Sequence, residues 1–214
     1  MAIPAIAYPR QTPIAELRDG LFYPTRSFAN FLELLAKRAS VTVALLNSGS
    51  VSAAATLDID LTGYTAYRGV AVVLDGFVPA TDGVDLYLRF SSDGGATFDA
   101  SGYNYAGNRT TDGGTNIAFG SGNAAQIAIT GSAGIGNAAT EGIHLDLRLL
   151  RQTSTALWGR VMFQAYAISL DVPPVGYTAV GGGAREAAQD TDAIRFLFSS
   201  GNIARGTWAV YGLP

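Results

Sequence analysis

The stretch that decides the fold is Asp190–Pro214, which reads DTDAIRFLFSSGNIARGTWAVYGLP. Within it Ile194, Phe196 and Phe198 are separated by single residues, and this period of two is typical of a half-buried β-strand. The polar residues Ser199–Asn202 follow as a turn, and a second alternating run comes after them. The stretch therefore predicts a hairpin whose second strand lies inside a sheet.

Strand patterns continue upstream of this hairpin. Clusters of Gly, Asn, Asp and Ser separate the apolar runs at intervals that are typical of sandwiches and barrels. No helical pattern lies between the runs, which argues against a parallel α/β sheet. Including the hairpin, about nine strands are expected, and the other runs are Val41–Leu46, Thr56–Leu61, Arg68–Phe77, Val84–Phe90, Gln126–Thr130, Ile143–Leu150 and Leu157–Leu170. We predict an all-β chain in which residues 41–214 form an antiparallel β-sandwich or jelly roll.

Residues 1–40 differ from this β region. Pro4, Pro9 and Pro13 exclude a long helix near the start, and two interpretations are open for residues 1–26: an extended arm on a neighbouring subunit or a disordered leader. The large apolar side chains there favour the arm. Prolines and the lack of an apolar core also distinguish this segment from a signal peptide.

One amphipathic helix is predicted between this arm and the β region. Ser27 is a favourable N-cap, and the helix extends to Arg38. Four apolar residues fall on one face at helical spacing, and they are Phe28, Phe31, Leu32 and Leu35. We expect residues 1–40 to anchor the protein or to bring copies of it together.

The composition indicates a surface that is covered by other subunits. Charged residues make up only 14% of the 214 residues, against about 25% in ordinary soluble domains. Charge depletion is typical of interface cores, and the alternative is a monomer with a Ser-, Thr-, Asn- and Gly-rich surface. The net charge of −3 and the single lysine, Lys37, exclude a nucleic-acid-binding patch. The chain has no cysteine, which excludes disulfides and thiolate metal sites, and no apolar run approaches the length of a membrane span.

The ending of the chain resembles a known class of proteins. A strand, the turn Ser199–Asn202 and a final strand closing on Tyr211–Leu213 are similar to the C-termini of small β-sandwich proteins of tailed-phage particles. The resemblance covers about one eighth of the chain and includes no catalytic motif. It implies a virion structural protein, such as a head decoration, head-fibre or tail-associated protein, that contacts other virion proteins and copies of itself in a trimer or ring.

A local motif spans Ser91–Phe98, SSDGGATF. It resembles the Asp-box pattern S-x-D-x-G-x-T-F, which recurs in sialidase propellers and in unrelated β proteins. The carboxylate of such a turn accepts backbone N–H bonds, and its glycines adopt positive φ. Because no repeating blades accompany the single box, we interpret it as a structural turn formed by Ser91, Asp93, Gly95, Thr97 and Phe98.

Ligand contacts are expected in two glycine-rich stretches, Asp99–Gly122 and Gly131–Gly142, which we predict to be surface loops. A third loop is expected over Gly181–Gln189. Aromatic rings can stack on the C–H faces of sugars, whereas Trp158 and Trp208 lie in strand patterns typical of the core. The predicted glycan or receptor contacts are therefore Tyr103, Asn104, Tyr105 and Asn108.

Catalysis has little support in the sequence. The only histidine, His144, shares a strand face with Asp146, which could form the base half of a catalytic triad, but no nucleophile motif accompanies it. Carboxylate pairs that could bind Ca²⁺ or hydrolyse glycosides also fit the solvent face of a sheet, and they are Asp58 with Asp60, Asp82 with Asp85, and Asp190 with Asp192. We predict no catalytic residue, no metal ligand set and no cofactor, with Ca²⁺ at a loop left open.

The sequence thus predicts a non-enzymatic particle protein made in the host cytoplasm, anchored by residues 1–40 and displaying its sandwich outward. Two roles are open, capsid or tail decoration and attachment to a host-surface glycan. The alternative from another class is a carbohydrate-binding or carbohydrate-active β-sandwich protein that uses the tyrosines and carboxylates named above.

Overall fold

The structure is a computed structural model that describes residues 15–18, 21–24, 43–150, 152–169 and 175–214. The chain divides into two compact units, Met1–Thr42 and Val43–Pro214. In the first unit, β1 (Ala15–Arg18) and β2 (Leu21–Pro24) form an antiparallel hairpin within the predicted arm. The helix predicted over residues 27–38, with Phe28, Phe31, Leu32 and Leu35 on its apolar face, lies outside the described residues.

The second unit consists of strands. Every pair of named strands is antiparallel, and the described residues contain no α-helix, only the 3₁₀ turn η1 (Thr62–Tyr64). The strands are β3 (Ala44–Ala54), β4 (Thr56–Asp60), β5 (Gly69–Pro79), β6 (Leu86–Ser91), β7 (Tyr103–Thr111), β8 (Asn116–Ala124), β9 (Ile127–Ala128), β10 (Gly142–Leu150), β11 (Arg160–Ile168), β12 (Gly176–Arg185), β13 (Ala193–Phe198) and β14 (Ile203–Leu213).

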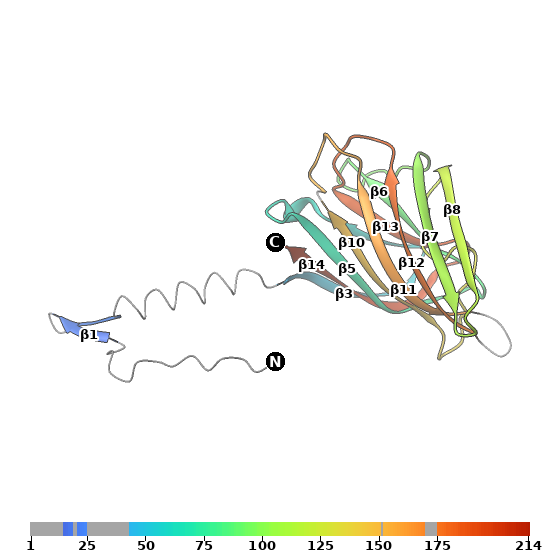
Figure 1. The fold of residues 1–214 in the computed structure, drawn as a ribbon, viewed down its shortest axis with the longest axis horizontal. Helices are drawn as coiled ribbons and strands as arrows, with labels where there is room; N and C mark the ends of the chain where they lie inside the picture. Colours follow the sequence, from blue (N-terminus) through green and yellow to red (C-terminus); the bar gives the residue numbers. More distant parts are fainter. Residues whose placement is uncertain (1–14, 19–20, 25–42, 151, 170–174) are drawn as a thin grey trace. The chain divides into compact units, whose positions relative to one another are not determined.

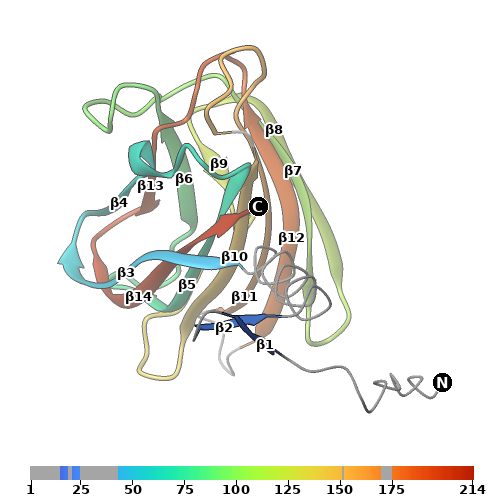
Figure 2. The same cartoon turned by 90° about the vertical axis from the view of Figure 1, so that its left-hand side faces the viewer.

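These strands form two sheets of unequal width. The large sheet has eight strands in the order β3-β14-β5-β10-β11-β12-β7-β8, and the small sheet has four in the order β4-β13-β6-β9. Figure 1 shows the large sheet in front, and Figure 2 shows the two sheets as separate layers. The prediction of an all-β antiparallel fold is confirmed, and the two sheets are consistent with a β-sandwich.

The core lies between the two sheets, where alternate residues of each strand point inward. In β10, Leu145, Leu147 and Leu149 are buried, whereas the residues between them are exposed. The small sheet contributes Phe196 from β13 and Phe90 from β6, both fully buried. The alternation predicted for the last hairpin is therefore the burial pattern of β13.

The large sheet extends beyond the small one, and its inner face is filled there by aromatic rings lying over glycines. Gly181 of β12 pairs with Phe163 of β11 on one side and with Gly107 of β7 on the other. Gly107 in turn pairs with Phe119 of β8. A Cβ built on Gly107 would lie 2.6 Å from the Phe119 ring, and one on Gly181 would lie 2.7 Å from the Phe163 ring. The glycines leave the space that these two rings occupy.

Two loop predictions are wrong. The stretch Asp99–Gly122 is largely the hairpin of β7 and β8, and Gly181–Arg185 is the end of β12 rather than a loop. Glycine and asparagine are poor strand formers by composition. Here pairing with neighbouring strands and close packing of rings on the backbone favour glycine, so the usual apolar alternation is missing.

We expect Gly181→Ala to destabilise the protein. The added Cβ would lie 2.7 Å from the Ala106 carbonyl oxygen as well as from Phe163, and overpacking of this kind costs about 1–3 kcal/mol. Urea denaturation followed by Trp fluorescence measures the change. Gly63→Ala is the matched control, since nothing lies within 4 Å of a Cβ there, and an equal loss in both variants would contradict the packing argument.

Candidate functional site

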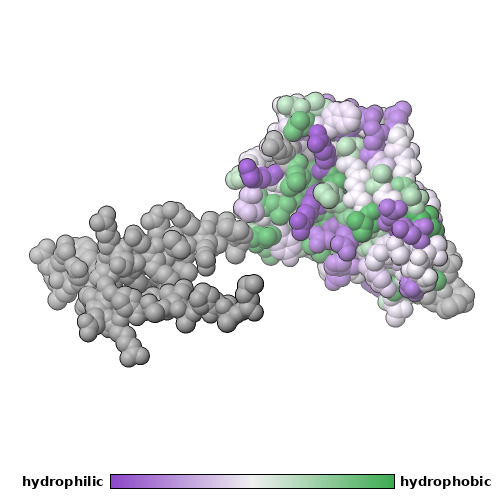
Figure 3. Space-filling view, in the orientation of Figure 1, coloured by the Kyte–Doolittle hydropathy of each residue, from purple (hydrophilic) through white to green (hydrophobic). Residues whose placement is uncertain are grey.

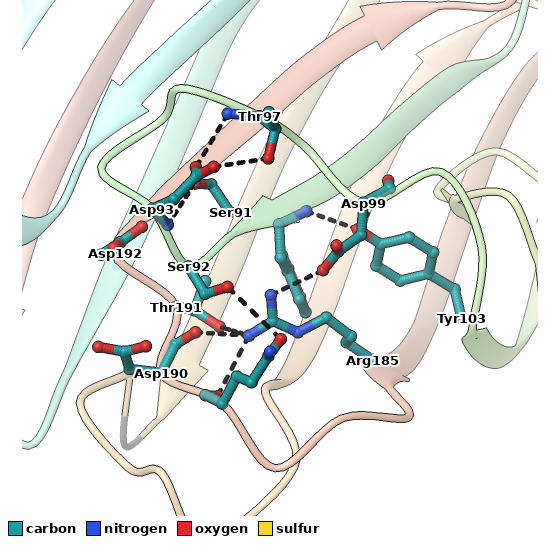
Figure 4. A network of polar contacts seen from close by, with 12 residues as sticks. Ser91, Ser92, Asp93, Thr97, Asp99, Tyr103, Arg185, Asp190, Thr191 and Asp192 are labelled. Carbon is teal, nitrogen blue, oxygen red and sulfur yellow. Dashed lines mark hydrogen bonds and ion pairs between the residues drawn. The ribbon is translucent and has the colours of Figure 1, made fainter.

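A polar network connects three loops of the second unit (Figure 4). It includes the turn after β6, the segment between β12 and β13, and the connection between β10 and β11. Asp192 N–H donates to the Ser91 carbonyl at 3.1 Å, Thr191 N–H to the Gln152 carbonyl at 2.6 Å, and Arg185 N–H to the Gly159 carbonyl at 3.0 Å. Backbone bonds therefore connect the three loops before any side chain contributes.

The turn Ser91–Phe98 is organised by one carboxylate. Oδ1 of Asp93 accepts the Thr97 N–H at 2.9 Å, and Oδ2 accepts the Thr97 hydroxyl at 2.6 Å. The Ser91 hydroxyl donates to Asp93 at 2.8 Å and accepts the Gly95 N–H at 2.9 Å. Gly94 and Gly95 have φ of 71° and 83°, a region that strongly favours glycine. This is the hydrogen bonding that an Asp-box turn requires.

These hydrogen bonds lower the pKa of Asp93 to about 2, and the largest contribution comes from the Thr97 side chain. The turn is closed from two further sides. The Gly94 N–H donates to the Asp192 carboxylate at 2.9 Å. The ring of Phe98 lies 3.8 Å from a Cβ built on Gly95, and the Arg195 guanidinium lies 4.0 Å from the centre of that ring.

Arg185, the last residue of β12, is the largest buried polar side chain of the described residues. Its guanidinium pairs with the Asp99 carboxylate at 2.8 Å. The same group donates to the carbonyls of Gln189 and Asp190 and lies 5.9 Å from the centre of the Phe90 ring. Because a buried charge needs partners, Arg185 fixes the positions of the loops that supply them.

Tyr103 belongs to the same network, and this corrects its predicted role. It is fully buried, its hydroxyl accepts the Phe90 N–H at 2.7 Å, and it donates to the Asp99 carbonyl at 3.2 Å. Burial raises the pKa of Tyr103 to about 12. A buried ring cannot stack on a sugar, so Tyr103 supports the Arg185 network instead of a surface contact.

The other three predicted contact residues, Asn104, Tyr105 and Asn108, do not form one site with Tyr103. Successive residues of a strand point to opposite faces, so Tyr105 shares the inner face of β7 with Tyr103, while Asn104 and Asn108 lie on the outer face. Tyr105 is half-buried, 6.4 Å from the Phe119 ring. Asn104 is engaged by Glu186 and by the Asn123 N–H. Residues in a loop could share one site, but residues on a strand are divided between two faces.

The candidate catalytic groups are also separated. His144 Nδ1 lies 3.3 Å from the Asp75 carboxylate on the neighbouring strand β5, so its partner is not Asp146. Both side chains are more than half exposed. No hydroxyl among the described residues hydrogen-bonds to the ring, so no triad is formed in this part of the chain.

The predicted carboxylates other than Asp190 have structural partners. Asp58 makes two bonds to Arg195, at 2.7 and 2.6 Å. Asp60 accepts the Thr62 N–H, Asp82 accepts the Asn137 N–H, and Asp85 accepts the Thr130 hydroxyl. Within the described ranges no group of three or more His, Cys, Asp or Glu side chains could hold a metal ion.

Sequence reasoning missed a hollow on the outer face of the large sheet. Trp158, expected in the core, is 45% exposed. It lines the hollow together with five apolar and two cationic neighbours, among them Leu150, Met162, Arg148 and Arg160. One feature of the sequence indicates that Trp158 is exposed. Trp158 lies next to Gly159, before the alternating pattern of β11 begins.

No family model matches the chain, and no curated protein matches it. In the described part of the chain, no helix is long and apolar enough to cross a membrane.

We expect NMR titration to give Asp93 a pKa near 2. Because the folded pKa is depressed, the stability that this carboxylate contributes is present above its ordinary pKa and is lost as pH falls toward about 2. Thr97→Val removes the hydroxyl donor and should raise the pKa of Asp93. Thr115→Val, in the β7–β8 hairpin loop, should leave it unchanged, and the same pKa in all three proteins would contradict this assignment.

Arg185→Met should destabilise the protein by about 1–3 kcal/mol, because it removes the donor to the carbonyls of Gln189 and Asp190. The measurement is the free energy of unfolding in urea. Arg205→Met is the matched control, since Arg205 is exposed and makes one bond, to the Ala139 carbonyl. Equal effects of the two substitutions would show that the Arg185 network does not hold the loops together.

Proposed function

We propose that this protein is a non-enzymatic structural component of a phage-like particle, anchored through residues 1–40 and displaying the sandwich of residues 41–214 outward for decoration or host attachment. The observation that carries the proposal is the strand order. If β7, β8, β11 and β12 are set aside, the sheets read β3-β14-β5-β10 and β4-β13-β6-β9. This is the order of an eight-stranded jelly roll, an architecture common in viral capsid proteins and lectin domains.

The sheet edges support a role in an assembly. β3 and β8 are the two edges of the large sheet, and neither contains a charged residue or a proline over its 11 or 9 residues. Free monomers usually protect their edge strands with charges, prolines or bulges, and each of these two edges has only one register shift, close to one end of the strand. Long uncharged edges fit a chain whose edges are covered by neighbouring subunits in a particle.

The site geometry supports a non-enzymatic role. Carboxylates of the pairs predicted from the sequence hold turns and strands, as with Asp58 on Arg195 and Asp82 on the Asn137 N–H. Hydrolysis of a glycosidic bond needs two carboxyl groups facing one cleft, whereas Asp58 and Asp60, which share β4, are each engaged by a partner of their own, Arg195 and Thr62.

A second candidate function is carbohydrate binding without catalysis. The exposed ring of Trp158 between Arg148 and Arg160 favours it, because such rings pack on sugar C–H faces with polar groups nearby. This site replaces the tyrosine site predicted from the sequence.

The particle assignment is tested by fractionating particles from lysates of the source host on density gradients. We expect the full chain to sediment with the particles and a chain lacking residues 1–40 to remain in the soluble fraction. A full chain found only in the soluble fraction would contradict the proposal.

In a parallel glycan-array experiment, binding that is lost in Trp158→Ala but kept in Tyr105→Ala would favour the second function.

A further inference from the structure

The outer face of the large sheet carries most of the exposed large apolar side chains of the second unit. Met162 is 69% exposed, Val180 52% and Tyr166 51%, and Leu150 is also more than half exposed. Figure 3 shows this face, where apolar and polar residues are interleaved across the strands. Exposed apolar surface of this kind marks an interaction site, and Met, Arg and aromatic residues are enriched at protein interfaces.

Two neighbouring rows of residues cross the middle of this face. The strand register defines row A as Tyr211, Ala71, Arg148, Met162 and Gly182, on β14, β5, β10, β11 and β12. On the same strands row B consists of Ala209, Val73, Asp146, Gln164 and Val180. The rows are two residues apart on every strand, which is about 6.6 Å at the usual rise of a strand.

The two rows are complementary in size. On β14, Tyr211 in row A is large where Ala209 in row B is small. On β12 the order is reversed, with Gly182 in row A and the exposed Val180 in row B. A hollow between Met162, Gln164 and Val180 gives space for a side chain from outside. On β14 and β12 the large residue therefore has a small one two positions away, whereas on β11 Met162 lies two positions from the long polar side chain of Gln164.

The rows are also complementary in charge. Arg148 in row A and Asp146 in row B are exposed on the central strand β10. Neither makes an ion pair or side-chain hydrogen bond with any described residue, whereas Asp58 is paired with Arg195 and Asp99 with Arg185. The two opposite charges are free for a partner that presents them in the reverse order.

A second copy of this chain presents that order. We propose that the outer face of the large sheet binds the same face of a second copy about a two-fold axis that runs across the strands between row A and row B. The rotation stacks each of these strands on its own copy, with row A opposite row B. Arg148 then faces Asp146 of the second copy, Val180 faces Gly182 and Tyr211 faces Ala209. A two-fold contact requires such self-complementarity, and stacked sheets pack face to face in this way.

Charge reversal tests the contact in the full-length chain. We expect sedimentation velocity to show dimers of the unmodified protein, and Asp146→Arg or Arg148→Asp to weaken dimerisation at least about tenfold, since each places like charges opposite one another. The double variant with both reversals should dimerise again. A mixture of the two single variants should also associate, because each supplies the charges that the other needs.

Two controls separate this contact from other effects. Ser101→Arg and Thr115→Asp place charges in loops outside rows A and B, and both should leave the mass unchanged. Circular dichroism and thermal melting show whether each variant folds. Since the chain has no cysteine, Met162→Cys gives an independent measurement: a short bismaleimide should crosslink it into dimers, whereas Ser101→Cys should stay uncrosslinked.

The contradicting outcomes are distinct. A monomer at every concentration, with no crosslink through Met162→Cys, would overturn the proposal. So would single variants that associate as tightly as the unmodified chain, because association would then run through residues 1–42 or another surface. Loss of dimers without recovery in the double variant and in the mixture would overturn the two-fold geometry. None of these results depends on the particle assignment, which gradient fractionation tests separately.

Discussion

The constraint on which the rest of this structure depends is the unequal width of its two sheets. The four strands of the small sheet cannot cover the whole inner face of the eight-stranded sheet. Apolar surface left uncovered there would be exposed to water, which is unfavourable. The protein fills the remainder with its own side chains, as Phe163 and Phe119 fold over Gly181 and Gly107. The short strand β9 completes this cover, with Ile127 against Gly183. The glycine-rich strands follow from this need for space.

The buried Arg185 solves a related problem at the end of the sandwich. Long connections between strands leave backbone carbonyls that need donors. A single guanidinium supplies several donors in a fixed plane, so one side chain satisfies the carbonyls of Gln189 and Asp190 while pairing with Asp99. The turn organised by Asp93 is connected to the same segment, because its Gly94 N–H donates to the Asp192 carboxylate. Arg185 and Asp192 are charged and lie close together, but many of their hydrogen bonds go to backbone groups. This pattern is typical of a structural network.

The sequence predicted the all-β class because apolar alternation in segments such as Ile194–Phe198 is a direct result of one buried face. It did not predict β7 and β8, since strands packed against aromatic rings need glycine where most strands carry apolar residues. The surface contact predicted for Tyr103 was wrong for the same reason, because Tyr103 lies on the inner face of a strand and is buried. The Arg185 network could not be predicted, because Asp99 and Arg185 are distant in sequence and only the fold brings them together.

The position of β14 has a consequence for how the protein folds. This strand, Ile203–Leu213, lies between β3 and β5 and pairs with both, although these two strands come early in the chain. Contacts between residues so far apart in sequence are slow to form, because a long loop must close first. Until β14 has been synthesised, β5 therefore lacks a partner on one edge and β3 lacks a partner on both edges. The large sheet is complete only when β14 is in place between β3 and β5, and aggregation during folding is most expected before that pairing forms.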